Sequence, residues 1–349
     1  MMEVKVDVKS SRWKRRPEGS NWGEFGDDDQ LGSVGRITPK KVLEGVAEVR
    51  EGRTFCLSMP LHYPISSLVV ARKPPRLRPV EMNGVSRVNF QFNADKPDIY
   101  SDDCVELDLQ YSTQWDGLAH AGLLFDVEAN GEPLPVYYNG YRAKIDVLGP
   151  SEMAGERDQS RAKKLGIEHF AVHGMQGRGV MIDLRAHLGD VRTRVSFDIL
   201  QRILEADRVV VEPGDMVCFH TGFADIIMEA DGRPDVEKLK RSCAVIDGSD
   251  KRLLDWITKT QISAIIADNF AVESLPKKSE RDDGHCHGST MPLHEHCLFK
   301  NGIPLAELWH LTPLANWLRQ HQRFRFLLTA PPLRLEGAMG SPVTPVATV

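Results

Sequence analysis

The sequence predicts an α/β fold, with one domain of mixed β-sheet flanked by helices. In the second half of the chain, segments of helical periodicity alternate with short runs of β-branched residues. Strand-like runs also occur in the first half, and neither a repeat nor a convincing linker divides the 349 residues. A chain of this length can bury one large core. We therefore expect an irregular N-terminal arm over residues 1–36 and one domain over residues 37–349.

The N-terminal arm is polar and rich in glycine, which favours irregular structure. Its Trp13, Trp22 and Phe25 are too apolar for a solvated tail, so we expect the arm to pack on its own body or on a neighbouring subunit, near the functional site. Thr38 and Pro39 predict the start of a helix that ends at Gly52. Its apolar face would contain Val42, Leu43, Val46 and Val49. Strands are predicted over residues 54–61, 67–72, 105–111 and 179–184.

The second half alternates more regularly. Ser196 and Asp250 each precede a helical pattern, as N-cap residues do. The predicted helices cover residues 197–206, 251–260 and 305–320. The predicted strands cover residues 208–211, 216–223, 262–268 and 324–330.

The charge, the apolar runs and the cysteines of the chain exclude several classes of protein. The net charge of −5 and the pI of about 6.2 give no reason to expect a nucleic-acid partner. The N-terminus lacks the apolar core of a secretory signal, and no apolar run approaches the roughly 18 residues of a membrane span. Six scattered cysteines without a Cys-x-x-Cys pair suit a reducing compartment. We expect a cytoplasmic protein that acts on a small molecule, with neither nucleic acid nor membrane as partner.

Several common catalytic motifs are absent from the sequence. There is no P-loop, and the glycines of residues 174–179 do not form G-x-G-x-x-G after a strand. There is also no G-x-S-x-G, and Ser289 lacks the strand–turn–helix setting of a nucleophilic serine. These absences argue against nucleotide-binding and serine-hydrolase sites.

One chemically dense stretch is QYSTQWDGLAH, residues 110–120. It follows a strand-like run, so its polar residues are expected where that strand ends in a loop. Asp116 and His120 are four residues apart and converge if the loop coils. In a purely structural interpretation, Asp116 caps a turn and His120 makes an ordinary hydrogen bond.

A second stretch concentrates histidine. Five of the twelve histidines fall within 26 residues, at positions 285, 287, 294, 296 and 310. His294 and Glu307 flank a turn over residues 301–304 that can bring the two side chains together. An imidazole and a carboxylate are what a hydrolytic metal site or an acid–base pair needs. A structural zinc site is the alternative, although zinc-finger spacings are absent.

These residues resemble the cyclase family of metal-dependent hydrolases, which includes bacterial kynurenine formamidase and isatin hydrolase. The family signature is H-x-G-T-H-x-D-x-P-x-H, and residues 110–120 follow its register. Thr113, Asp116 and His120 match, whereas Gln110 and Gln114 replace the two metal-binding histidines. Ser112 and Leu118 replace the glycine and the proline. Further similar stretches, among them residues 266–273, extend the resemblance from about residue 20 to residue 347.

The resemblance implies a swivelling β/β/α fold that assembles as a homodimer or homotetramer. It implies hydrolysis of a small amide, formamide, lactam or lactone, as in an arylformamidase, with a divalent metal. By position, His120 would be the general acid–base, and Trp115 either lines the substrate pocket or belongs to the core. The implied metal-site residues are Asp116, His294 and Glu307, with Gln110 and Gln114 at the positions of former ligands.

The two glutamines bear on the choice of metal. Amide and carboxylate oxygens favour Mn²⁺, Mg²⁺ or Ca²⁺ over Zn²⁺, and they hold any metal ion less tightly than imidazoles do. We expect a weakly bound, exchangeable ion, with Mn²⁺ favoured over Zn²⁺. His285, His287 or His296 could instead supply the missing nitrogens. A third alternative is a site without metal, in which the glutamines bind the substrate directly.

Two other functions remain open at this point. The chain could be a metal-poor lyase, dehydratase or cyclase in which His120 and a carboxylate transfer protons. It could also be a ligand-binding member of the family without catalytic activity.

Overall fold

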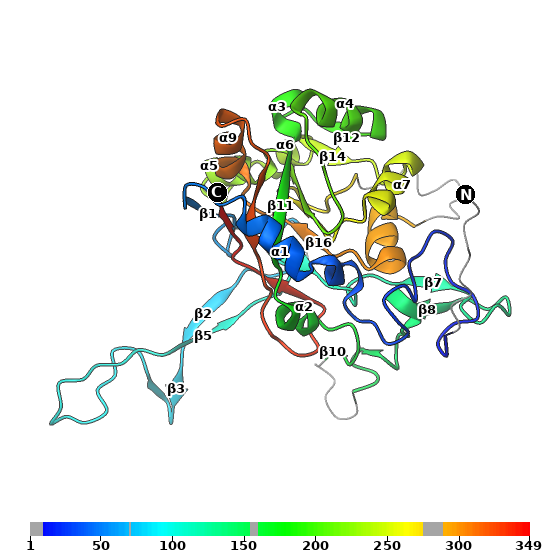
Figure 1. Ribbon diagram of the computed structural model, residues 1–349. Coiled ribbons are helices and arrows are strands. Elements are labelled where there is room, and N and C mark those ends of the chain that lie inside the picture. The colour runs from blue at the N-terminus through cyan, green and yellow to red at the C-terminus, as the bar shows by residue number, and fades with distance from the viewer. Residues whose placement is uncertain (1–9, 70, 154–159, 275–288) are drawn as a thin grey trace.

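The computed structural model describes residues 10–69, 71–153, 160–274 and 289–349, and it is built on a curled nine-stranded sheet flanked by helices (Figure 1). The predicted α/β fold with a mixed sheet is therefore confirmed. In order across the sheet, the strands are β1 (Thr54–Cys56), β19 (Val346–Thr348), β17 (Arg325–Thr329), β11 (Gln176–Asp183), β13 (Met216–His220), β15 (Ala264–Ala267), β16 (Leu305–Glu307), β6 (Gln114–Asp116) and β18 (Gly340–Pro342).

The centre of the sheet is parallel and its two flanks are antiparallel. Strands β11, β13, β15 and β16 run parallel, so their carboxyl ends meet at one edge. Strand β6 pairs antiparallel with β16 and places Gln114 opposite Glu307. On the other side, β17, β19 and β1 follow β11 in antiparallel pairs. The β6–β16 pairing joins two segments that are almost 200 residues apart in sequence.

Short helices and small sheets surround the main sheet. The helices are α1 (Pro39–Val46), α2 (Glu168–His173), α3 (Leu184–Leu188), α4 (Phe197–Asp207), α5 (Phe223–Glu229), α6 (Val236–Leu239), α7 (Lys251–Thr260), α8 (Pro292–His294) and α9 (Thr312–Gln320), with 3₁₀ turns η1 (Gly32–Arg36) and η2 (Tyr138–Gly140) and the π-helix η4 (Glu295–Lys300). The two-stranded sheets pair β2 (Arg76–Pro79) with β5 (Asp103–Glu106), β3 (Glu81–Met82) with β4 (Val85–Ser86), β7 (Leu123–Phe125) with β8 (Leu134–Val136), β9 (Val147–Leu148) with β10 (Arg161–Ala162) and β12 (Thr193–Val195) with β14 (Ala244–Ile246).

Helix α1 begins as predicted but buries a different face. Thr38 accepts a hydrogen bond from the Lys41 backbone N–H, and Pro39 is the first helical residue. The helix ends at Val46, and Leu43 is 68% exposed. Helix α1 buries this other face because its backbone lies very close to the sheet at Gly45. A Cβ at Gly45 would lie 2.7 Å from the carbonyl carbon of Gly177 on β11. Backbone proximity, and not an apolar stripe, therefore orients α1.

Several other predicted elements are absent from the structure or shorter than predicted. Residues 208–211 form no strand, and neither do the described residues of 67–72. Residues 305–307 form β16, and the helical part of the predicted 305–320 segment is α9 alone. Only residues 105 and 106 of the predicted strand 105–111 belong to β5, which is exposed on both faces. A segment with high strand propensity forms a strand only where another strand can pair with it and its side chains can pack.

The N-terminal arm packs on the body of its own chain. Trp13 and Trp22 are buried in the main hydrophobic core, and the Trp22 indole N–H donates to the Phe299 carbonyl at 2.8 Å. The arm therefore rests on η4, the segment that directly follows His294. In the part of the chain that the structure describes, no helix combines the length and the apolar character needed to cross a membrane.

Candidate metal centre

Strand β6 presents its polar side chains to one side of the sheet. Successive strand residues point to opposite faces, so Gln114 and Asp116 share a face and Trp115 points the other way. Trp115 is fully buried, donates its indole N–H to the Ala330 carbonyl at 2.8 Å and packs edge-on against Trp309. Of the two alternatives for Trp115, substrate pocket or core, this placement favours the core, because the ring is buried and packs against Trp309.

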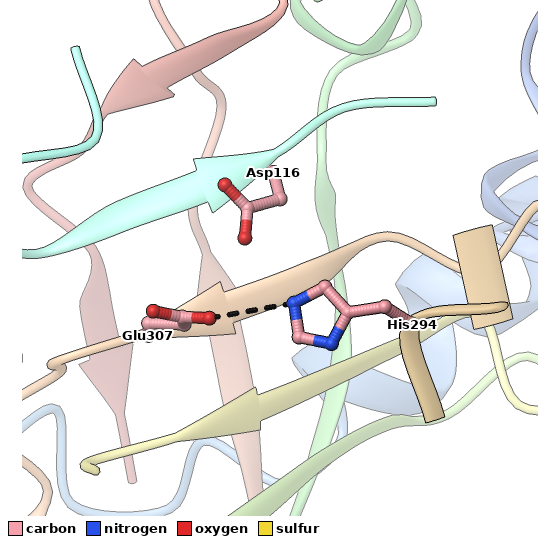
Figure 2. Close-up of side chains that lie close together, drawn as sticks. All are labelled: Asp116, His294 and Glu307. Carbon is pink, nitrogen blue, oxygen red and sulfur yellow. Dashed lines mark ion pairs between the residues drawn. The ribbon is translucent and has the colours of Figure 1, made fainter. Parts of the chain in front are cut away.

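Asp116, His294 and Glu307 converge from three different elements (Figure 2). Asp116 ends β6, Glu307 ends the neighbouring strand β16, and His294 ends the short helix α8. One possible ligand atom from each side chain lies within 4.8 Å of the other two, and all three residues are buried. The His294 Nε2 is 3.7 Å from Oε1 of Glu307. Two carboxylates and one imidazole at this spacing can surround a single cation.

The charges of this cluster are incompletely balanced. Oδ2 of Asp116 is buried and has no hydrogen-bond partner among the described residues. Burial raises the pKa of Asp116, while His294 holds the pKa of Glu307 below its ordinary value in spite of burial. Buried carboxylates without full pairing are costly, and a bound cation relieves that cost.

Glu273 orients His294. Its Oε1 accepts hydrogen bonds from Nδ1 (2.8 Å) and from the backbone N–H (3.0 Å) of His294, and Oε2 accepts from the Leu293 N–H at 2.9 Å. This leaves Nε2 directed at Glu307 and Asp116. Burial alone would lower the pKa of His294, but the hydrogen bond with Glu273 and the nearby Glu307 carboxylate outweigh burial and raise it to about 10.

Sequence reasoning did not single out Glu273. It is the last residue of the family-like stretch 266–273, but it lies 21 residues before His294, and no periodic spacing connects the two. A carboxylate that holds the second nitrogen of a metal-ligating histidine is a common arrangement in metal sites. The resemblance was the one signal that could have pointed to this residue.

The Gln114 side chain adjoins both carboxylates. Its Nε2 lies 3.3 Å from Oδ1 of Asp116 and 3.4 Å from Oε2 of Glu307. With the amide turned over, Nε2 donates instead to the backbone carbonyls of Gln110 (2.6 Å) and Ser112 (3.2 Å). Oε1 then faces the two carboxylates, an arrangement that a cation between the three oxygens would stabilise.

Gln110 and His120 lie at the rim of the cluster. The Gln110 Nε2 is 3.5 Å from Nδ1 of His120, and the His120 Nε2 is 3.7 Å from Oδ1 of Asp116. The His120 side chain is 26% exposed, so its imidazole can exchange protons with solvent or a ligand. The structure thus brings Gln114 to the three converging side chains and places the Gln110 side chain beside His120.

Among the described histidines of the histidine-rich stretch, only His294 belongs to this cluster. His296 points away, toward α7, where its Nε2 pairs with Oγ1 of Thr258 at 2.9 Å. Burial lowers the pKa of His296 to about 4. This placement corrects the idea that His296 supplies a missing ligand, because its Nε2 is engaged with Thr258 on α7 and does not face the cluster. His285 and His287 lie outside the described residues.

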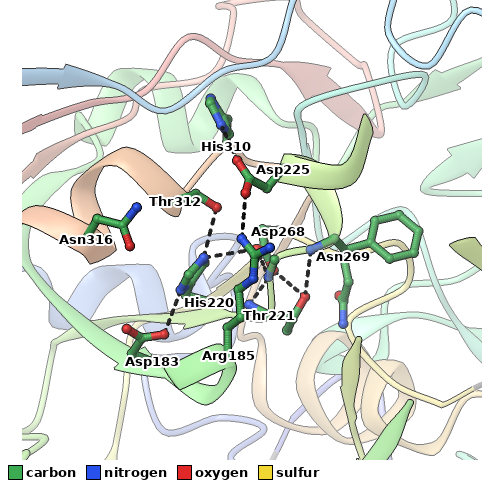
Figure 3. A network of polar contacts seen from close by, with 12 residues as sticks. Asp183, Arg185, His220, Thr221, Asp225, Asp268, Asn269, His310, Thr312 and Asn316 are labelled. Carbon is green, nitrogen blue, oxygen red and sulfur yellow. Dashed lines mark hydrogen bonds and ion pairs between the residues drawn. The ribbon is translucent and has the colours of Figure 1, made fainter. Parts of the chain in front are cut away.

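A second buried polar network was missed by sequence reasoning (Figure 3). His220, at the end of β13, pairs through Nδ1 with Asp183 at 2.7 Å and through Nε2 with the Thr312 hydroxyl at 2.9 Å. Asp268 accepts hydrogen bonds from the Thr221 N–H and hydroxyl and from the Gly222 N–H. Both ring nitrogens and both Asp268 oxygens are satisfied, which is typical of a structural network.

Known proteins resemble this chain in sequence and fold. A sequence model of the Cyclase family matches residues 56–274, and no curated protein matches. A solved structure described as a novel cyclase is 26% identical, covers 95% of this chain and 97% of its own, and superposes with a TM-score of 0.71.

Isatin hydrolases share the fold at greater distance. Isatin hydrolase A from Ralstonia solanacearum is 16% identical over 89% of this chain and 97% of its own, with a TM-score of 0.51. Isatin hydrolase A from Labrenzia aggregata is 13% identical over 88% and 97%, with a TM-score of 0.53. Because the family match spans more than half of the residues and a solved cyclase superposes along nearly the whole length, this chain belongs to the cyclase family.

Proposed function

We propose that this protein is a metal-dependent hydrolase of a small amide, formamide, lactam or lactone. The observation that carries the proposal is the buried convergence of Asp116, His294 and Glu307, with Oδ2 of Asp116 left without a hydrogen-bond partner in the described part of the chain. The fold shared with isatin hydrolases supports the substrate class, since isatin is a cyclic amide. Arylformamidase-like activity is the first form to test.

The residues of the cluster fit a divalent cation. Asp116 and Glu307 would supply oxygen ligands, His294 would supply Nε2, and Gln114 would supply Oε1 in its turned-over orientation. Three oxygens and one nitrogen favour Mn²⁺ over Zn²⁺. A divalent cation in this position supplies Lewis-acid chemistry, acidifying a bound water and polarising a carbonyl group.

The surrounding residues of the chain have separable tasks. Glu273 fixes the His294 ring so that Nε2 faces the cluster. His120 is partly exposed and 3.7 Å from Asp116, a position from which it can accept a proton and return it to a departing amine or alcohol. Gln110 contacts Nδ1 of His120 and thereby orients the imidazole.

The test combines metal content with turnover. Protein purified without chelator is analysed for bound metals and then titrated with Mn²⁺ and Zn²⁺. It is next assayed with formamides, lactams and lactones, beginning with N-formylkynurenine. We expect turnover that requires a divalent ion, is supported best by Mn²⁺ and is lost on dialysis against EDTA.

Three outcomes would contradict the proposal. Tightly bound zinc that survives EDTA would remove the preference for manganese. Full activity of the metal-free protein would remove the metal from the reaction. Elimination or dehydration without any hydrolysis would favour a lyase that uses His120.

A further inference from the structure

Arg72 lies at the edge of the candidate metal centre. It precedes strand β2, which forms with β5 the stem of a hairpin that projects from the body of the molecule (Figure 1). The Arg72 side chain is half-buried, and its Nη1 donates to the backbone carbonyl of Gln110 at 2.6 Å. Arg72 therefore holds the segment that leads into β6.

The Gln110 carbonyl connects Arg72 to the cluster. When the Gln114 amide is turned over, its Nε2 donates to this same carbonyl at 2.6 Å, so that Gln114 and the guanidinium share one acceptor. The Gln110 side chain lies 3.5 Å from Nδ1 of His120. Burial raises the pKa of Asp116, and the positive charge of Arg72 is among those that oppose the rise. The guanidinium is thus within electrostatic range of the Asp116 carboxylate.

The Arg72 guanidinium has unused binding capacity. A guanidinium carries five N–H donors in a planar fork and stays charged. Among the residues that the structure describes, the Gln110 carbonyl is the one hydrogen-bond acceptor of this side chain, and no carboxylate forms an ion pair with it. Arg78 on the same hairpin pairs with Glu106, and Arg142 pairs with Glu128. The fork of Arg72 can therefore receive an anion from a ligand.

We propose that Arg72 binds a carboxylate of the substrate, so that this site acts on anionic amides, formamides, lactams or lactones. The inference rests on the proposed function, because it assigns a substrate group to the same site. The acidic cluster repels an anion, so a substrate carboxylate needs a cationic partner of its own at the rim. One guanidinium balances one negative charge and matches the two oxygens of a carboxylate.

Arg72 and His120 contact different parts of Gln110, its backbone carbonyl and its side-chain amide. A substrate whose leaving group lies at His120 can thus place a carboxylate on the guanidinium. Arg72 takes no part in proton transfer, because its guanidinium stays protonated. Its contribution is binding and orientation, so its loss is expected in KM more than in kcat.

The test compares probes that share one scissile bond. Formanilide is neutral, whereas the ortho, meta and para formamidobenzoates add a carboxylate to its ring. Steady-state kinetics with Mn²⁺ gives kcat and KM, and calorimetry in the His120→Ala background gives Kd with little turnover. We expect the wild-type protein to prefer one of the formamidobenzoates. For that compound, Arg72→Gln should raise KM and Kd by about 10–100-fold.

Two comparisons separate anion binding from the anchoring of Gln110. The loss with formanilide in Arg72→Gln should be much smaller, because formanilide has no group for the guanidinium. Arg72→Lys should recover part of the binding, since it keeps the charge without the fork. Thermal melting checks that each variant is folded.

The matched control is Arg76→Gln. Arg76 has the same charge, is also half-buried and lies four residues further along the chain, on β2 opposite Glu106. We expect KM for both kinds of probe to stay at the wild-type value. An effect as large as that of Arg72→Gln would show that general positive charge is responsible, and it would overturn the inference.

The remaining outcomes separate this inference from the proposed function. Equal losses with both kinds of probe in Arg72→Gln, unchanged KM and Kd in that variant, or no wild-type preference for a carboxylate would overturn the inference. Hydrolysis that is indifferent to the carboxylate would do so while supporting the proposed function. Binding of a formamidobenzoate that depends on Arg72 but leads to no hydrolysis would support the inference and contradict the proposed function.

Discussion

His220 and His294 are both buried histidines that pair with a carboxylate, but their surroundings differ. His220 has a partner on each ring nitrogen, Asp183 on one side and Thr312 on the other. His294 has Glu273 on Nδ1, while its Nε2 faces two carboxylates at longer range. One of these carboxylates, Asp116, keeps an oxygen for which the described residues provide no hydrogen-bond partner.

The difference separates structural polar groups from candidate functional ones. A satisfied network stabilises the fold and offers nothing to a ligand. An unsatisfied buried carboxylate is retained at a cost to stability, which is expected where a ligand completes it. Amino-acid composition does not distinguish the His220 network from the His294 cluster, since each contains histidine and acidic residues. The two differ in whether the hydrogen-bonding groups all have partners.

The largest expected effect is that of Asp116→Asn. The substitution removes a ligand charge, so we expect Mn²⁺-supported turnover to fall to background. It also removes a buried charge whose Oδ2 has no hydrogen-bond partner among the described residues, so the free energy of unfolding of the metal-free protein should not fall. Kinetic assays with added Mn²⁺ and urea unfolding without metal measure the two effects.

The matched substitution in the satisfied network is Asp268→Asn. It disrupts hydrogen bonds from Thr221 and Gly222 to a buried carboxylate, so we expect a loss of about 3 kcal/mol in stability. Activity per folded molecule should be retained. Equal destabilisation by Asp116→Asn and Asp268→Asn would show that Asp116 has a structural role, as Asp268 does.

His120→Ala should have the next largest effect. Removal of a general acid–base lowers kcat by roughly 10²–10⁴. Metal binding and thermal stability should be unchanged, because His120 lies at the rim and is partly exposed. Steady-state kinetics with Mn²⁺ titration measures both quantities. Near-normal kcat would assign proton transfer to another residue.

Glu273→Gln should have an intermediate effect. Loss of the carboxylate that orients a metal-ligating histidine weakens metal binding by about 10–100-fold. Calorimetric titration with Mn²⁺ measures the change. The control is Glu295→Gln, because Glu295 follows His294 in sequence but pairs with Lys300 at 2.9 Å. Unchanged affinity in Glu273→Gln, or an equal loss in the control, would argue against orientation by Glu273.

The smallest expected effect belongs to Thr312→Val. It removes one hydroxyl from the His220 network and should cost about 1 kcal/mol of stability. Turnover and metal affinity should match wild type. Urea unfolding measures the stability, and Mn²⁺-supported turnover measures the activity. A tenfold loss of activity would show that the His220 network contributes to function.

Local sequence determined much of the scaffold. The buried runs at β11, β13, β15 and β17 and the amphipathic helices α4 and α7 lie where periodicity predicted them. Their pattern follows from nearest-neighbour geometry, which repeats every two residues in a strand and every 3.6 in a helix. The ordered motifs also pointed to the cyclase family before any contact was known, because a family signature is a property of sequence order.

Tertiary structure decided which of these residues meet. The antiparallel register of β6 and β16 sets Gln114 opposite Glu307, turns Trp115 into the core and leaves Asp116 facing His294. Tertiary packing also brought Glu273 to His294, paired His296 with Thr258 and left residues 71–106 without a buried side chain. Sequence alone could not predict these outcomes, since strand pairing and burial depend on contacts between residues far apart in the chain.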